Sequence, residues 1–188
     1  MGAEERRAEA MVIWIGLTGA CLVPLCVFKM GFNLSALTVF AFLITLTAVA
    51  FTDIATMEIP NGYVIAILVI SLISVFIMPG PALGERLIGA VSVSLPLTLI
   101  TLAVPGAFGG GDIKLMGVCG LFLGWKLNLL ALFLAVVTGG SYGIYLLVSG
   151  RKGRKEHFAF GPFLCLGMLA ALFWGDELLR CYLKLYGL

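Results

Sequence analysis

Long apolar runs, separated by short breaks that are polar or rich in glycine and proline, make up most of the chain. A run of about 20 apolar residues is long enough for a helix to cross a membrane. Six full-length spans are predicted on this basis, at 11–28, 34–52, 61–78, 86–104, 127–149 and 160–175. A shorter apolar segment at 112–124 follows three glycines and ends before Trp125. The pattern therefore predicts an all-α fold, a polytopic transmembrane helical bundle with about six full spans plus one short helix.

The composition agrees with a membrane protein. Hydrophobic residues make up 61% of the chain and charged residues 12%, with a mean hydropathy of +1.12. A soluble domain carries about 25% charged residues, which excludes that class. We predict a single membrane-embedded domain over 1–188, in contact with the lipid bilayer, with a cytoplasmic N-terminus at 1–10 and an interfacial amphipathic tail at 176–188. The net charge of +2 is too small to suggest nucleic acid as a partner.

Cysteine usage does not point to a metal site. The five cysteines include no C-x-x-C pair, and all lie in or beside apolar runs, at positions 21, 26, 119, 165 and 181. We interpret them as small apolar packing residues rather than metal ligands or disulfides. No metal and no cofactor are therefore predicted.

Basic residues in one break predict the orientation of the bundle. Residues 151–155 include four lysines or arginines, and short loops of this kind face the cytoplasm. Counting spans backwards places the breaks at 53–60 and 105–111 on the same side. The helix from Asp112 to Trp125 would be about 20 Å long, against a hydrocarbon core of about 30 Å. Asp112 is thus expected about 10 Å below the cytoplasmic surface.

Asp53 and Asp112 are the two acids most nearly within the membrane on that side. Two carboxyl groups that are brought together cannot both ionise easily, so one keeps a proton while the other stays charged. Such a pair can activate water and polarise a carbonyl, which hydrolyses a peptide bond with neither a covalent intermediate nor a metal. The residues alone leave two other interpretations open: a pair of acids that couples ion or proton movement, or plain loop acids.

Gly109, Gly110 and Gly111 directly precede Asp112. Glycines remove side chains and permit unusual dihedral angles, so they would let a substrate backbone approach closely. A glycine-rich turn followed by a helix-capping aspartate would have the same sequence. The stretch by itself does not distinguish these interpretations.

Three blocks of sequence resemble one family. The residues GGGD at 109–112 fit the G-x-G-D pattern of intramembrane aspartyl proteases. DIATMEIPNGYV at 53–64 and GGGDIKLMGVCGLFLGW at 109–125 resemble the two aspartate-containing blocks of type IV prepilin peptidases, and FAFGPFLCLG at 158–167 resembles their C-terminal block. Order and spacing also fit, over most of the chain.

The resemblance implies that Asp53 and Asp112 are catalytic. It implies a multi-pass enzyme of the bacterial inner membrane, with its active site facing the cytoplasm, that cleaves the basic leader from prepilin-like proteins (pilins, pseudopilins or Flp-type pilins). The chain resembles a short form without the cytoplasmic cysteine-containing domain, so N-methylation of the product is not expected. Which pilin class is the substrate, and the oligomeric state, are not predicted.

Residues around the two aspartates carry further expectations. Lys114 either pairs with an aspartate or extends to the inner interface. Glu58 could attract a basic leader or be a solvated loop acid, and Asn61, after Pro60, is expected to cap the third span. Phe160, Gly161 and Pro162 are expected to shape the wall opposite the aspartates, with Pro162 in the first turn of the last helix. His157 is interpreted as a surface histidine.

Two functions of other classes remain open from the sequence. One is an ion- or proton-coupled transport component that uses Asp53 and Asp112. The other is a non-catalytic protein of pilus or secretion assembly. Replacing either aspartate by asparagine distinguishes both from a peptidase.

Overall fold

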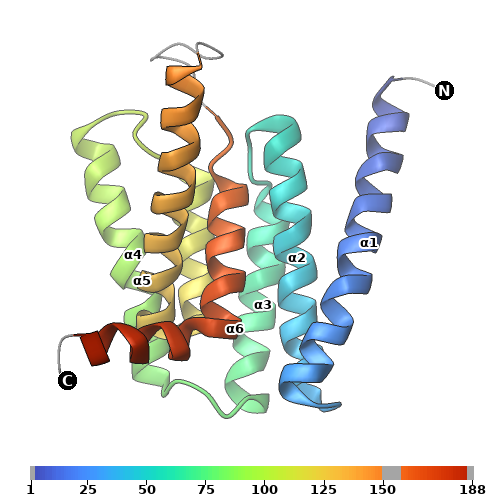
Figure 1. The fold of residues 1–188 in the computed structure, drawn as a ribbon, viewed down its shortest axis with the longest axis vertical. Helices are drawn as coiled ribbons and strands as arrows, with labels where there is room; N and C mark the ends of the chain where they lie inside the picture. The colour runs from blue at the N-terminus through green and yellow to red at the C-terminus, as the bar shows by residue number, and fades with distance from the viewer. Residues whose placement is uncertain (1–2, 150–157, 186–188) are drawn as a thin grey trace.

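The protein is a bundle of helices (Figure 1). A computed structural model describes residues 3–149 and 158–185, with side chains over 13–149 and 158–184. The described helices are α1 (Ala3–Met30), α2 (Leu34–Thr56), α3 (Asn61–Ile77), α4 (Leu83–Ala103), α5 (Gly110–Val148) and α6 (Gly161–Leu185). Within these residues, five helices are long and apolar enough to cross a membrane, and α3 is a shorter apolar helix. The predicted fold class, a multi-pass helical membrane bundle, is confirmed.

The longest helix, α5, reverses direction at Gly124. Gly124 has φ 75° and ψ 171°, a conformation that glycine adopts without the steric cost of a side chain. Residues twelve apart in a continuous helix would lie about 18 Å from each other. Asn128 nevertheless donates from Nδ2 to the carbonyl oxygen of Met116 at 3.2 Å, twelve residues back. The chain therefore folds back on itself, and α5 contains the predicted short helix as well as the span that follows it.

Local sequence explains how α2 stays helical in an apolar setting. The side chain of Asn33 caps the helix by accepting from the backbone N–H of Ala36 at 2.8 Å. Thr45 and Thr47 donate their hydroxyls to carbonyls four residues earlier, at 2.8 and 2.9 Å. These bonds satisfy polar groups that lipid cannot. The helix ends at Thr56 and is followed by the C-cap residue Met57, whose φ of 55° lies in the left-handed region.

The short first part of α5 lies at the centre of the bundle. Its side chains Leu115, Met116 and Cys119 are fully buried. The ring of Phe122 stacks on that of Phe42 in α2, with centroids 4.0 Å apart. Large apolar side chains of α1, α3 and α4 are instead widely exposed, which suits a lipid-facing surface. One face of the short helix is thus packed against protein rather than against lipid.

Two helices extend beyond the predicted membrane spans. The first helix begins at Ala3 rather than at residue 11, because alanine, glutamate and arginine are strong helix formers and extend the helix beyond the apolar run. The last helix continues to Leu185 rather than ending at residue 175. Figure 1 shows the C-terminal part of α6 turning across the lower end of the bundle. Its placement at a membrane interface stays a prediction.

Candidate active site

Three helix ends that are distant in the sequence meet at the upper end of the bundle in Figure 1. Asp53 lies in the last turn of α2, Asp112 in the first turn of α5, and Gly161 is the first residue of α6. Because successive helices alternate in direction, these three ends lie on one side of the bundle. The described turns at Gly31 and Gly124 lie at the opposite end. The predicted placement of both aspartates on one side agrees with this arrangement.

Asp53 is buried and directly bonded to α6. Its side chain is 5% exposed, and its Oδ2 accepts a hydrogen bond of 2.8 Å from the backbone N–H of Gly161. A Cβ atom on Gly161 would lie 2.6 Å from the same Oδ2, which is closer than real contacts allow. Gly161 therefore combines a hydrogen bond with clearance for the carboxyl group.

Asp112 is buried beside Asp53. Its side chain is 9% exposed, and a Cβ atom on Gly109 would lie 3.1 Å from its Oδ2. The carboxyl groups of Asp112 and Asp53 lie close enough to interact electrostatically. Cys165, one turn after Gly161 on α6, interacts with both carboxyl groups. The structure thus brings together the two acids that the sequence singled out.

The three glycines before Asp112 have different surroundings. Gly111 packs on the loop after α2, because a Cβ atom there would lie 2.9 Å from Cβ of Ile59. A Cβ atom on Gly110 would have no described atom within 4 Å, so Gly110 faces open space. These three glycines do not use their freedom to adopt unusual dihedral angles, since the described glycines with positive φ are Gly31, Gly106 and Gly124. Close approach, rather than backbone conformation, is what the structure requires of Gly109 and Gly111.

Lys114 and Asn61 contact each other. Lys114 Nζ donates to Asn61 Oδ1 at 3.2 Å, and among the described residues no carboxylate lies within salt-bridge distance of Lys114. The expected cap by Asn61 was also wrong, because α3 begins at Asn61 and Pro60 occupies the cap position. A residue inside the first turn cannot cap its own helix, and its side chain is free to reach α5 instead. The pair links α3 to the helix that carries Asp112.

The remaining predicted residues lie around this end of the bundle. Glu58 is exposed, and its backbone N–H and carbonyl both bond to the Thr56 hydroxyl.

The Phe160 ring lies 6.1 Å from that of Phe108 in the loop before α5, so it forms part of the wall near Asp112. Pro162 is the second residue of α6, as its fixed φ suits. His157 and the basic run 151–155 lie outside the described residues.

The sequence reasoning missed residues that act at a distance from the aspartates. Arg86 is 2% exposed and donates to the carbonyl of Leu121 at 2.9 Å. Its position in the sequence could have indicated a structural role, because a cation in the first turn of a helix is unfavourable with respect to the helix dipole unless it bonds to another element. Asn128, fully buried in an apolar run, gave a similar signal. Cys165 gave none.

Within the part of the chain whose side chains are described, no group of three histidines, cysteines or acids could hold a metal ion. The described site offers two carboxyl groups, a backbone N–H and a nearby thiol. Such a set can share one proton between two carboxyl groups and exchange protons with a bound water.

Comparison with known proteins shows the family to which the chain belongs. The model of the type IV leader peptidase family matches residues 40–144, a range that contains both aspartates and the glycines before Asp112. The chain belongs to this family.

Curated relatives carry one name. The chain is 33% identical over 169 residues to a protein of Bacillus subtilis, and 30% identical over 163 residues to one of Legionella pneumophila; each is named prepilin leader peptidase/N-methyltransferase. The matches cover 90% and 81% of this chain, but 68% and 55% of those relatives. The chain therefore spans between half and two thirds of the length of most curated relatives that it matches. No solved structure matches it.

Proposed function

We propose that this protein is a membrane aspartic endopeptidase that removes the leader from type IV prepilin-like proteins. The observation that carries the proposal is the meeting of Asp53 and Asp112, both buried and from separate helices, at one end of the bundle. Membership of the type IV leader peptidase family supports a peptidase over a transport component or an assembly protein. The names of the relatives support prepilins as the substrate class.

In the proposed reaction, the two carboxyl groups hold one proton between them. The charged member takes a proton from a water molecule, which attacks the scissile carbonyl, and the protonated member donates to the carbonyl oxygen. Collapse of the tetrahedral intermediate returns a proton to the leaving amine and breaks the peptide bond. The Gly161 N–H orients Asp53 during these steps, and Gly109 leaves room for the Asp112 carboxyl group.

We further propose that the aspartate end of the bundle faces the cytoplasm of a bacterial inner membrane. The positive-inside rule supports this orientation through the basic run 151–155. The relatives come from bacteria, which supports a bacterial inner membrane as the location of this protein. A leader that carries positive charge would then meet the site without crossing the bilayer.

Substitution of each aspartate tests the proposal. Asp53→Asn and Asp112→Asn keep the size of the side chain but remove its ability to exchange a proton. Each should lower the rate of leader removal by about 10²- to 10⁴-fold, the usual contribution of a general acid or base. Each enzyme variant is co-expressed with a prepilin and membranes are prepared. The measurement is the ratio of processed to unprocessed prepilin in these membranes.

Asp176→Asn serves as the matched control, because Asp176 is an exposed aspartate near the opposite end of α6. It should cleave at the parent rate. Cleavage at the parent rate by either site variant would rule out the pair mechanism. Normal pilus assembly with both variants, without processing, would favour an assembly protein, and ion flux that depends on Asp112 would favour transport.

N-methylation is named for the relatives and is a separate question for this chain. Intact mass of the processed product answers this question, because each methyl group adds a fixed increment.

A further inference from the structure

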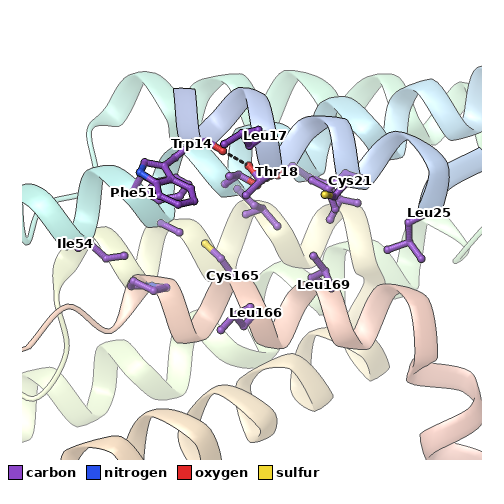
Figure 2. Close-up of a pocket in the computed structure, with 16 residues that line it drawn as sticks. Trp14, Leu17, Thr18, Cys21, Leu25, Phe51, Ile54, Cys165, Leu166 and Leu169 are labelled. Atoms are coloured by element: carbon purple, nitrogen blue, oxygen red, sulfur yellow. Dashed lines mark hydrogen bonds between the residues drawn. The ribbon is translucent and has the colours of Figure 1, made fainter. Parts of the chain in front are cut away.

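An apolar groove runs down the bundle from the aspartate end, between α1, α2 and α6 (Figure 2). Its volume is about 580 Å³. Side chains of α2 form its floor, and those of α1 and α6 form its two walls, as in the group Leu17, Ala50, Ile54, Pro162, Cys165 and Leu169. Almost all of the lining is apolar, so a ligand that fills the groove must itself be apolar.

The upper end of the groove lies next to the aspartate pair in the chain, although neither aspartate lines it. Ile54 follows Asp53 directly and lines the groove, as does Pro162 after Gly161. Cys165 both lines the groove and interacts electrostatically with the two carboxyl groups. A molecule lying in the groove would therefore have its upper end beside the site.

Within the residues whose side chains are described, the polar contacts between α1 and α6 lie at the lower end of the groove. At the lower end, Lys29 of α1 donates to the carbonyl of Phe173 at 3.4 Å and lies 3.8 Å from Glu177, both in α6. At the upper end, Figure 1 shows α1 leaning away from α2. Trp14 and Leu17 of α1 are 56% and 54% exposed there. The groove thus opens sideways, toward lipid, at the end where the aspartates lie.

The length of the groove fits a short helix. Its floor runs along α2 from Leu43 to Ile54, which corresponds to about 16 Å or three helical turns. Backbone groups in lipid must be bonded internally, so an apolar peptide segment entering from the bilayer would be helical. Its direction would follow the helices that line the groove.

We infer that this groove binds the hydrophobic helix that follows the scissile bond of the substrate, with the N-terminus of that helix at Asp53 and Asp112. The inference rests on the proposed function and on the resemblance to type IV prepilin peptidases, which implies that the substrates carry a hydrophobic helix directly after the leader. The shape and the apolar lining of the groove would then favour substrates whose membrane helix fits the groove over its first three turns. Positive charge in the leader would remain outside the groove.

Native cysteines provide the first test. Cys21 lines the groove and is exposed, whereas Cys181 is exposed on α6 and does not line it. The Asp112→Asn enzyme is bound to prepilins that carry a single cysteine at successive positions of the membrane helix, and disulfide formation is induced. Trp14 lines the groove at its upper end, where the scissile bond is expected, and Cys21 lies about 10 Å further down α1. This distance corresponds to seven residues of helix, so Cys21 should crosslink most strongly about seven residues after the scissile bond. Cys181 should crosslink weakly at every position.

A bound prepilin that crosslinks to Cys181 as strongly as to Cys21, or to neither, would overturn the inference. Crosslinks between two copies of the enzyme through Cys21 would do so as well, because the groove would then be an interface between protomers.

Filling the groove provides the second test. Leu17→Trp should raise KM for a membrane prepilin by roughly tenfold, since the larger ring occupies space that the substrate helix needs. Leu99→Trp is the matched control, because Leu99 is 57% exposed on α4, on the far side of the bundle from α1. It should leave KM unchanged.

Equal KM values for Leu17→Trp and Leu99→Trp would contradict the inference, even if Leu17→Trp loses a lipid that copurifies with the parent. Such a result would leave the proposed function intact. Failure of the proposed function has a different signature, namely that the parent enzyme does not cleave, or that Asp53→Asn cleaves as fast as the parent.

Discussion

At the scale of single residues, the backbone of Gly161 determines how Asp53 is held. The carboxyl group accepts the Gly161 N–H at 2.8 Å, and the space above that N–H is too small for a methyl group. The clearance requires glycine, whereas the N–H donor and the backbone conformation do not. The residue therefore belongs to the site without contributing any side chain.

Gly161→Ala should lower the rate of leader removal by roughly 10²-fold, because a displacement of the carboxyl group by about 1 Å misaligns the reacting atoms. Gly62→Ala is the matched control. It adds the same methyl group in the first turn of α3, where no described atom lies within 4 Å. Processing of prepilin by both variants is compared at equal enzyme level. If Gly161→Ala and Gly62→Ala cleave equally fast, the carboxyl group does not depend on this clearance.

Single residues also show the limit of prediction from sequence. Asp53 and Asp112 could be singled out because charged groups are rare in apolar runs. The contact of Lys114 with Asn61 could not, because it joins two helices whose rotation depends on packing along their whole length. A sequence places a residue on an element but does not say which way its side chain points.

At the scale of elements, Arg86 secures the short helix that carries Asp112. Its Nη1 donates to the carbonyls of Leu121 and Phe122, the last turn before the reversal. Those carbonyls have no partner within their own helix, and a cation at this end complements the helix dipole. A further bond of 2.8 Å reaches the Ser74 hydroxyl of α3. One side chain thus holds three elements together at the end opposite Asp112.

Arg86→Met should lower the free energy of unfolding by about 3 kcal/mol, since a hydrogen bond to a charged group contributes roughly 1.5–3 kcal/mol. The measurement is thermal or denaturant unfolding of the purified protein in detergent. Arg180→Met is the matched control, because Arg180 is exposed and bonds within its own helix to Asp176. A stability equal to that of Arg180→Met would show that Arg86 does not secure the short helix.

The elements themselves were largely predictable. Apolar runs fix where helices form in lipid, because no other structure satisfies the backbone there. The separation of the short helix from the next span followed from its length and from the G-W-K break. The way the two parts fold together did not, since it depends on Gly124 meeting Pro81, where a Cβ atom would lie 2.9 Å from its ring.

At the scale of the whole molecule, the two ends of the bundle differ in chemistry. One end carries the aspartates and opens into the groove, and the other is tied together by Arg86 and Lys29. The sequence predicted which residues share an end, because each span reverses the direction of the chain. It did not predict the groove, because the lean of α1 depends on contacts between whole helices.

Labelling from each side of the membrane checks the proposed orientation. In an enzyme without other cysteines, Phe32→Cys should react with a membrane-impermeant maleimide in intact spheroplasts, because Phe32 is 98% exposed between α1 and α2. Ala107→Cys, in the exposed loop before Asp112, should react only after the membrane is permeabilised. The opposite pattern would reverse the orientation and remove the cytoplasmic placement of the site.

The bond between Asp53 and Gly161 joins residues 108 positions apart. During synthesis, α2 and both parts of α5 enter the membrane well before α6 does. Asp53 and Asp112 can approach each other at that stage, but Asp53 still lacks its backbone donor. If Asp53 is catalytic, as proposed, a chain that stalls before its last helix therefore lacks the backbone N–H that holds this carboxyl group in place.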